Sequence, residues 1–184
     1  IGWFTAFDQK QAVDGKGKAL PWVTYSFIDF IKERIAKTQH IFEYGSGSST
    51  IFYAERAGKV TSVEHDKGWF DKVKGTSPAN AEMIFCELHR DGEYARKAML
   101  LDKKFDIIIV DGRDRVNCCK YSLEALSPDG VIILDDSERE VYQPARILLK
   151  ENGFKEISFS GISPGLFYEK ATSVFYKSSN CLGI

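Results

Sequence analysis

Short apolar runs recur along the chain, and the segments between them are long enough to form helices. Residues 105–110 and 131–134 are almost wholly apolar, which is typical of parallel strands buried on both faces. Three earlier apolar runs are less regular, but each is likewise followed by a segment between two runs. The pattern therefore predicts five strands, at residues 41–44, 60–63, 83–86, 105–110 and 131–134.

Helices are predicted between and after these strands. Residues 50–57 end at Gly58, and residues 116–126 end at a Ser-Pro-Asp-Gly turn, so both have the length and the stop signal of a crossover helix. A stripe with helical spacing predicts one further helix over residues 138–151, and it consists of Val141, Ala145, Leu148 and Leu149. Strands that alternate with helices indicate a parallel sheet.

The two ends of the chain follow different patterns. Residues 154–160 and 172–176 read as two strands whose short connection has no room for a crossover helix, so we expect them to pair antiparallel at one sheet edge. Near the start, Ile28, Ile31 and Ile35 mark one helix face. We therefore predict a helical cap over residues 1–39 on a domain of residues 40–184, the whole forming one compact unit.

The predicted fold class is a Rossmann-like, doubly wound α/β sheet of seven strands, mostly parallel with an antiparallel last strand and with helices on both faces. Its ligand crevice should lie at the carboxyl ends of the first and fourth strands.

Charge and composition argue against some classes of binding partner. Lys and Arg number 25 against 26 Asp and Glu, so no overall field attracts nucleic acid or anionic lipid. No apolar run approaches the roughly 20 residues of a membrane helix. Four cysteines without a C-x-x-C pair indicate reduced thiols and a cytoplasmic location. We expect a small-molecule partner, no nucleic acid and no membrane, with monomer and homodimer both open.

A glycine loop follows the first strand, in the sequence Glu43-Tyr44-Gly45-Ser46-Gly47-Ser48-Ser49-Thr50. Gly45 and Gly47 permit a sharp turn and leave no Cβ between the backbone and a ligand. Glu64 ends the second strand, 19 residues after Gly45, where a carboxylate can accept hydrogen bonds from ribose hydroxyls. Strand, loop, helix and acid occur in the order of a nucleotide-like site.

The carboxylate of Glu43 distinguishes between cofactors. It would repel a pyrophosphate, whereas it would attract the cationic amino and sulfonium groups of S-adenosylmethionine. No Lys follows the glycines, which excludes a P-loop. An NAD-dependent oxidoreductase remains an alternative, although Thr50 replaces the third glycine of its motif and little chain is left for a catalytic domain. A non-catalytic S-adenosylmethionine-binding module is a further alternative.

These residues resemble the signature regions of class I S-adenosylmethionine-dependent methyltransferases, over about residues 38–177, and several stretches are similar to a bacterial group within that class. The resemblance implies that the glycine loop surrounds the methionine portion, that Glu64 holds the ribose, that His65 lies against the ribose or adenine, and that Asp91 lies near the adenine edge. The expected cofactor-binding residues are Glu43, Gly45, Ser46, Gly47, Ser49, Thr50, Glu64, His65, Asp91, Asp111, Trp22 and Tyr25.

Acidic residues follow the fourth and fifth strands. Asp111 ends one, and Asp135 with Asp136 ends the other, so their carboxylates should converge. Such a cluster needs a cation, shared protons or arginine partners, and the nearest arginines in sequence are Arg113, Arg115 and Arg139.

Three interpretations of this cluster stay open. In catechol and caffeoyl-coenzyme A O-methyltransferases, which this region resembles, such residues bind a divalent metal, and oxygen ligands suit Mg²⁺ or Ca²⁺. That resemblance makes Asp111, Asp135 and Asp136 candidate metal ligands. Alternatively, Asp111 or Asp136 acts without metal, positioning the substrate or deprotonating a hydroxyl. The third interpretation is a structural network of salt bridges.

Trp22 and Tyr25 precede the first predicted helix, where they form either a lid over the cofactor or part of the core. Residues 1–39 and 161–171 lie outside the cofactor-binding segments and are expected to shape the acceptor pocket. The sequence thus predicts an S-adenosylmethionine-dependent methyltransferase that yields S-adenosylhomocysteine and transfers a methyl group to a small molecule, with a hydroxyl oxygen as the expected acceptor atom.

Overall fold

A seven-stranded sheet forms the centre of the protein in the computed structural model, which describes residues 2–184. The strand order is β3-β2-β1-β4-β5-β7-β6. Strands β1 to β5 are parallel, and β7 runs antiparallel between β5 and β6. The predicted fold class is confirmed. The strands are β1 (His40–Tyr44), β2 (Lys59–Glu64), β3 (Ala81–Phe85), β4 (Phe105–Val110), β5 (Leu126–Asp135), β6 (Lys155–Gly161) and β7 (Lys170–Tyr176).

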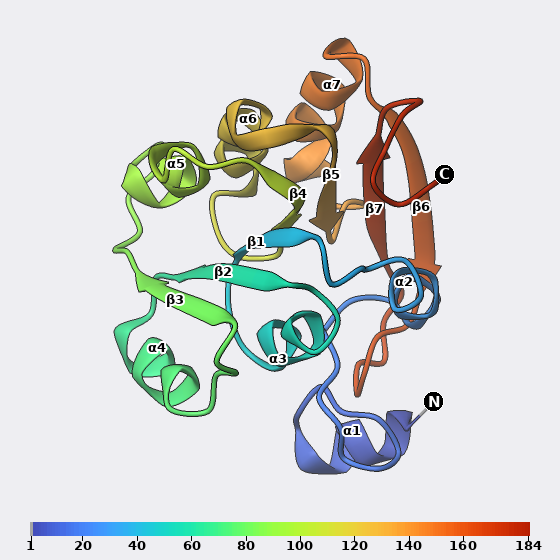
Figure 1. Cartoon of the computed structure of the whole chain (residues 1–184). Helices are drawn as coiled ribbons and strands as arrows, with labels where there is room; N and C mark the ends of the chain where they lie inside the picture. Colours follow the sequence, from blue (N-terminus) through green and yellow to red (C-terminus); the bar gives the residue numbers. More distant parts are fainter. Residues whose placement is uncertain (1) are drawn as a thin grey trace.

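Helices cover both faces of this sheet (Figure 1). One face packs against α2 and α3, and the opposite face packs against α5, α6 and α7, which gives two separate apolar cores. The short helix α1 lies beside the connection between β6 and β7. The helices are α1 (Trp3–Gln9), α2 (Tyr25–Ile31), α3 (Ser48–Ala54), α4 (Lys67–Lys74), α5 (Glu93–Leu100), α6 (Arg115–Ala125) and α7 (Gln143–Glu151).

Strand β4 shows why the central runs are almost wholly apolar. Its side chains alternate between the two cores: Ile107 and Ile109 join the α2–α3 core, and Ile108 and Val110 join the α5–α7 core. All four are buried. A strand covered on both faces has few positions for a polar side chain. The exception in β4 is Asp106 near its start, which is half-buried and accepts from the His40 N–H at 2.8 Å.

The helix predicted over residues 138–151 is wrong in its first part. A 3₁₀ turn occupies Glu140–Tyr142, and α7 begins only at Gln143, with Pro144 in its first turn. Proline favours the first turn because it lacks an N–H and would clash inside a helix. Val141, assigned to the buried stripe, is 67% exposed, whereas Ala145 and Leu149 are buried as expected.

The amino-terminal segment contributes to the α2–α3 core. Helix α2, capped by the Thr24 hydroxyl, contributes Phe27, Ile28 and Ile31 to the α2–α3 core. The domain boundary at residue 39 stays a prediction. Within residues 2–184, no helix is long and apolar enough to cross a membrane.

The loops that follow β1 and β4 touch each other through glycines. A Cβ placed on Gly112 would lie 2.1 Å from the Tyr94 hydroxyl and 3.1 Å from the backbone nitrogen of Gly45. Gly45 itself has φ of 95°, in the left-handed region that favours glycine. The two loops can approach this closely only without side chains there.

We expect Gly112→Ala to lower the free energy of unfolding by about 1–3 kcal/mol, because the added methyl group overpacks this contact. Urea denaturation would measure the change. Gly68→Ala is the matched control, since its Cβ would meet only Asp66 Oδ1, at 3.4 Å, in the first turn of α4. Equal stability of the two variants would contradict the close contact between the loops.

Candidate functional site

Acidic side chains replace apolar ones where the central strands end, on the sheet face that α3 covers. Glu43 of β1 pairs in register with Ile109 of β4, and Ile109 pairs with Ile133 of β5. Asp111 and Asp135 each lie two residues beyond these isoleucines, so the period of two brings them to the same face. The Asp111 N–H also donates to the Tyr44 carbonyl at 3.2 Å, which continues the β1–β4 ladder. One acidic residue from each central strand therefore borders the predicted crevice.

Glu43 anchors the glycine loop. Its Oε2 accepts hydrogen bonds from Thr50 Oγ1 at 2.6 Å and from Ser62 Oγ at 2.9 Å. Thr50 Oγ1 in turn accepts from the Gly47 N–H at 3.1 Å. Burial raises the pKa of Glu43 to about 7, against the opposing effect of hydroxyl donors that include Ser49. Thr50, at the position of the missing third glycine, thus connects the buried acid to the loop.

The outer side of the loop is held by Trp69, a residue that the sequence alone does not identify. Its indole Nε1 donates to the Ser46 carbonyl at 2.8 Å. Its ring lies against Gly47, where an added Cβ would be 3.5 Å from it. Asp66 fixes the indole by capping α4, because its carboxylate accepts from the Trp69 N–H at 2.7 Å. The glycine loop is therefore held between β1 and α4.

Glu64 lies beside the loop at the end of β2 and is almost fully buried. Its Oε1 accepts from the backbone N–H groups of His65 and Asp66 at 2.7 and 2.8 Å, and His65 Nδ1 lies 2.9 Å away. Its Oε2 accepts from Ser46 Oγ at 2.9 Å. A carboxylate oxygen has two lone pairs, so Oε2 retains capacity for a ligand hydroxyl.

Asp91 is placed on the surface, in the loop after β3. Its Oδ1 accepts from the Tyr121 hydroxyl at 2.6 Å and from Arg96 Nη2 at 3.1 Å, while its N–H donates to Asp114. These contacts tie Asp91 to α5 and α6 and not to Glu64 or the glycine loop. Its expected place at an adenine edge stays a prediction.

Lys170, at the start of β7, inserts a buried ammonium group between Asp135, the last residue of β5, and Asp136. Its Nζ lies 2.5 Å from Asp135 Oδ2 and 2.7 Å from Asp136 Oδ1, and it donates to the Trp22 carbonyl at 3.1 Å. Asp135 Oδ1 accepts from the Thr172 hydroxyl at 2.8 Å. This lysine is 35 residues from Asp135 in the sequence, and only the sheet brings the two together.

Arg115, the first residue of α6, reaches all three acids. Its guanidinium lies 3.1 Å from Asp111 Oδ1, 3.6 Å from Asp135 Oδ2 and 3.3 Å from Asp136 Oδ2. Arg139 adds a second contact to Asp136 Oδ2, at 2.9 Å. Three carboxylates thus face three cationic groups, and two of the three arginines near in sequence are among them.

The acids differ in their readiness to ionise. Burial opposes the charge of Asp136, but Lys170, Arg115 and Arg139 outweigh it and lower its pKa. Burial and the neighbouring Asp135 raise the pKa of Asp111 well above the ordinary value, despite Arg115. Asp111 is also less enclosed, with 22% of its side chain exposed against 6% for Asp136.

A divalent metal does not fit this cluster as it stands. Asp135 and Asp136 direct their oxygens at the Lys170 ammonium, and Arg115 occupies the space between them and Asp111. Among residues 2–184, no group of three or more His, Cys, Asp or Glu side chains is arranged to hold a metal ion. The geometry favours the salt-bridge network, and metal binding by Asp111, Asp135 and Asp136 stays an untested prediction.

Buried hydroxyl groups with no hydrogen-bond partner among residues 2–184 lie close to the crevice. Tyr53 of α3 is fully buried, and the charged groups nearest to its hydroxyl include Glu43, Asp111 and Asp135. The Tyr94 hydroxyl lies against Gly112, next to Asp111. Tyr53 resembles a core aromatic residue in the sequence, so only its surroundings reveal it.

The predicted lid residues contact the connection between β6 and β7. Trp22 Nε1 donates to the Pro164 carbonyl at 2.8 Å, and the Tyr25 N–H donates to the Ile162 carbonyl at 3.1 Å. The hydroxyls of Tyr25 and Ser163 are buried and lack partners within residues 2–184. A cavity of about 230 Å³ adjoins this contact and is lined by Ala6, Phe7, Lys10, Trp22, Pro164, Gly165 and Leu166.

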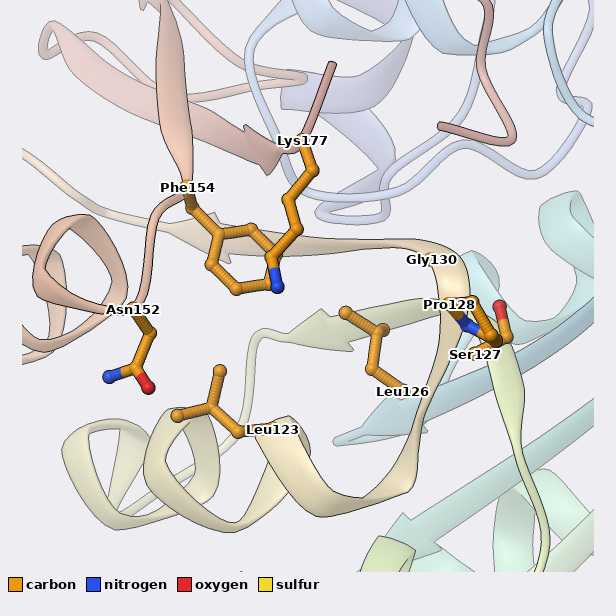
Figure 2. A pocket seen from close by; sticks show the side chains of 8 residues that line it. All are labelled: Leu123, Leu126, Ser127, Pro128, Gly130, Asn152, Phe154 and Lys177. Atoms are coloured by element: carbon orange, nitrogen blue, oxygen red, sulfur yellow. The ribbon is translucent and has the colours of Figure 1, made fainter. Parts of the chain in front are cut away.

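A second cavity of about 230 Å³ lies elsewhere (Figure 2). It is formed by the start of β5, around Leu126 and Pro128, together with Phe154 and Lys177. The start of β5 is opposite to the end that carries Asp135. This cavity is therefore separate from the crevice.

The arrangement of the chain is similar to that of solved methyltransferases. A methyltransferase-like protein from Silicibacter pomeroyi shares 19% identity with a TM-score of 0.62, over 87% of this chain and 89% of that one. An O-methyltransferase from Bacillus cereus, in complex with S-adenosylhomocysteine, shares 18% identity with a TM-score of 0.62, over 80% and 77%. This chain has the class I S-adenosylmethionine-dependent methyltransferase fold.

The similarity extends to almost the full length of one member of this fold. A precorrin-6y C5,15-methyltransferase from Geobacter metallireducens matches at 15% identity with a TM-score of 0.62, over 94% of this chain and 96% of that one. No protein-family model and no curated protein sequence matches the chain. At these identities the likeness concerns the class I fold alone.

The raised pKa of Glu43 predicts a pH-dependent loss of stability. Because the pKa is about 7 in the folded chain and about 4.5 when unfolded, the folded state binds the extra proton between these values. The contribution of Glu43 to the free energy of unfolding therefore falls as pH rises through this window, by about 3 kcal/mol. Glu43→Gln keeps an acceptor oxygen and should abolish this part of the pH dependence.

Urea denaturation at pH 5 and pH 8 would measure this effect. The free energy of unfolding of Glu43→Gln, relative to that of wild type, should increase when the pH is raised from 5 to 8. Glu82→Gln is a suitable control, because the ion pair with Lys59 lowers the pKa of this exposed acid and places its titration below the window. A constant difference between wild type and Glu43→Gln would show that Glu43 does not titrate there.

Proposed function

We propose that the protein is an S-adenosylmethionine-dependent methyltransferase that acts on a small molecule through a hydroxyl oxygen. The observation that carries this proposal is the pair of buried acids on neighbouring strand ends, Glu43 behind the glycine loop and Glu64 beside it. Their spacing on β1 and β2 suits a ligand with a cationic amino acid portion at one end and a ribose at the other.

In this proposal the methionine portion lies on Gly45 and Gly47, above Glu43. A cationic amino group favours the ionised form of Glu43, whose pKa near 7 means that the carboxyl is partly protonated before binding. Binding is therefore accompanied by release of a proton from Glu43. The Thr50 and Ser62 hydroxyls remain as donors that stabilise the resulting carboxylate.

In this proposal the ribose hydroxyls donate hydrogen bonds to Glu64 Oε2, next to Ser46. His65 flanks the same position, because its Nδ1 lies 2.9 Å from Glu64 Oε1 and its ring packs against Tyr94 with centroids 5.8 Å apart. The unpartnered hydroxyls of Tyr53 and Tyr94 supply further hydrogen bonds at the crevice. These residues bind and orient the ligand without reacting with it.

When bound, S-adenosylmethionine supplies an electrophilic methyl group, so the protein has to align the acceptor and remove its proton. Asp111 is the better candidate for accepting that proton, since its side chain is partly exposed at the crevice. Asp136 is the weaker candidate, because its oxygens are held by Lys170, Arg115 and Arg139. The cluster then acts mainly by fixing the position of Asp111 through Arg115.

The acceptor lies between the amino-terminal segment and the β6–β7 connection in this proposal. Trp22 and Tyr25 contact that connection, and the buried hydroxyls of Tyr25 and Ser163 offer hydrogen bonds to a polar group of the acceptor. The adjoining cavity of about 230 Å³ suits a ligand of small size. A net charge of −1 gives no attraction for a nucleic acid acceptor.

Isothermal titration with S-adenosylhomocysteine tests the proposal. We expect saturable binding to wild type and at least tenfold weaker binding to Glu64→Ala, because the ribose loses its acceptor. Glu87→Ala removes a carboxylate from an exposed loop and should bind as wild type does.

Absence of binding at high micromolar ligand would contradict the proposal. Retention of NADH in preference to S-adenosylhomocysteine would favour an oxidoreductase instead. Tight binding with no methyl transfer to any pool of acceptors would indicate a non-catalytic module.

A further inference from the structure

We propose that Lys170 is the resident cation of the crevice, and that its ammonium group fills the place between the strand-end acids where a divalent metal would otherwise bind. This inference goes beyond the proposed function, because it concerns how the acids are neutralised whichever ligand the crevice takes. Where methyl transfer does occur, it follows that the reaction needs no divalent metal.

The position of the ammonium group carries the inference. Lys170 is only 4% exposed, yet its Nζ contacts one oxygen each of Asp135 and Asp136, at 2.5 and 2.7 Å. A buried lysine is costly unless its charge is matched, and here two carboxylates match it. The ammonium bridges the two acids in the way that a bound cation would.

The balance of charge opposes an additional cation. Asp111, Asp135 and Asp136 carry at most three negative charges, and Lys170, Arg115 and Arg139 already supply three positive ones. A divalent ion would have to displace the ammonium group or leave a surplus of positive charge in a buried site. Without Lys170, Asp135 and Asp136 lose the cation that bridges them and keep two oxygens of the kind that Ca²⁺ and Mn²⁺ bind.

Sheet register explains why a lysine lies there. Thr172 of β7 pairs with Asp135, and Val174 pairs with Ile133. Lys170 lies two residues before Thr172, so its side chain takes the same face of the sheet. The ammonium also donates to the Trp22 carbonyl, which connects the acid cluster to the segment proposed to bound the acceptor.

Thermal melting with metal ions alone tests the inference. We expect 1–10 mM Mn²⁺ or Ca²⁺, and equally EDTA, to leave the Tm of wild type unchanged. Lys170→Gln, which has similar length and no charge, should melt lower without metal and gain several degrees when either ion is added. Lys170→Arg retains the charge and should not respond to metal.

A double variant shows whether the acids on β5 are the ligands. Lys170→Gln combined with Asp136→Asn removes one positive and one negative charge, so the response to metal should disappear. Equal responses of wild type and Lys170→Gln to metal would overturn the inference.

A second measurement covers the case in which Lys170→Gln does not fold. Titration of wild type with Mn²⁺, followed by electron paramagnetic resonance, should show no bound ion. Stoichiometric binding that Asp136→Asn abolishes would overturn the inference. Neither experiment contains the cofactor, so this inference can fail while the methyltransferase proposal stands, and the reverse also holds.

Discussion

The charge balance at the carboxyl ends of β4 and β5 is the constraint on which the rest of the structure depends. Three carboxylates this close would repel one another, and each would raise the free energy of the folded state if it were left unpaired. Arg115 from α6 and Lys170 from β7 neutralise them in the interior. Through these two residues the acids join the central strands to a crossover helix and to the antiparallel end of the sheet.

A second polar centre, around Glu43, links the fold to the proposed function. Glu43 holds the glycine loop through Thr50. Burial of the same carboxyl raises its pKa. A cationic ligand group would relieve the cost of ionising it, so that ligand binding and loop anchoring use one carboxylate. Trp69 packs against the outer side of the glycine loop, so the inner side of the loop faces the crevice.

The sequence alone predicts the sheet well, because the rule involved is local. Apolar runs such as residues 105–110 must be strands buried on both faces, and they are. The helix predicted before residue 143 is wrong because Pro144, and not the apolar periodicity, sets where α7 begins. Glu43, Glu64 and Asp111 are likewise identifiable, since each stands at the end of a predicted strand.

Other residues reach the site only through contacts between segments that are distant in the sequence, and no local sequence pattern predicts such contacts. Lys170 meets Asp135 only through the register of β5 with β7. The sequence does show that Lys170 lies on the same face of its strand as Thr172 and Val174. A lysine at an inward position of a buried strand requires an acidic partner, so this spacing predicts that one exists. Tyr53 and Trp69 offer no such signal, because each fits an ordinary amphipathic helix.

A crystal structure of the protein with S-adenosylhomocysteine tests the central claim most directly. The account predicts the amino acid portion on Gly45 and Gly47 near Glu43, the ribose hydroxyls on Glu64, and the Lys170 ammonium still between Asp135 and Asp136. A ligand bound away from the carboxyl ends of β1 and β4, or a metal ion in place of the ammonium, would contradict it.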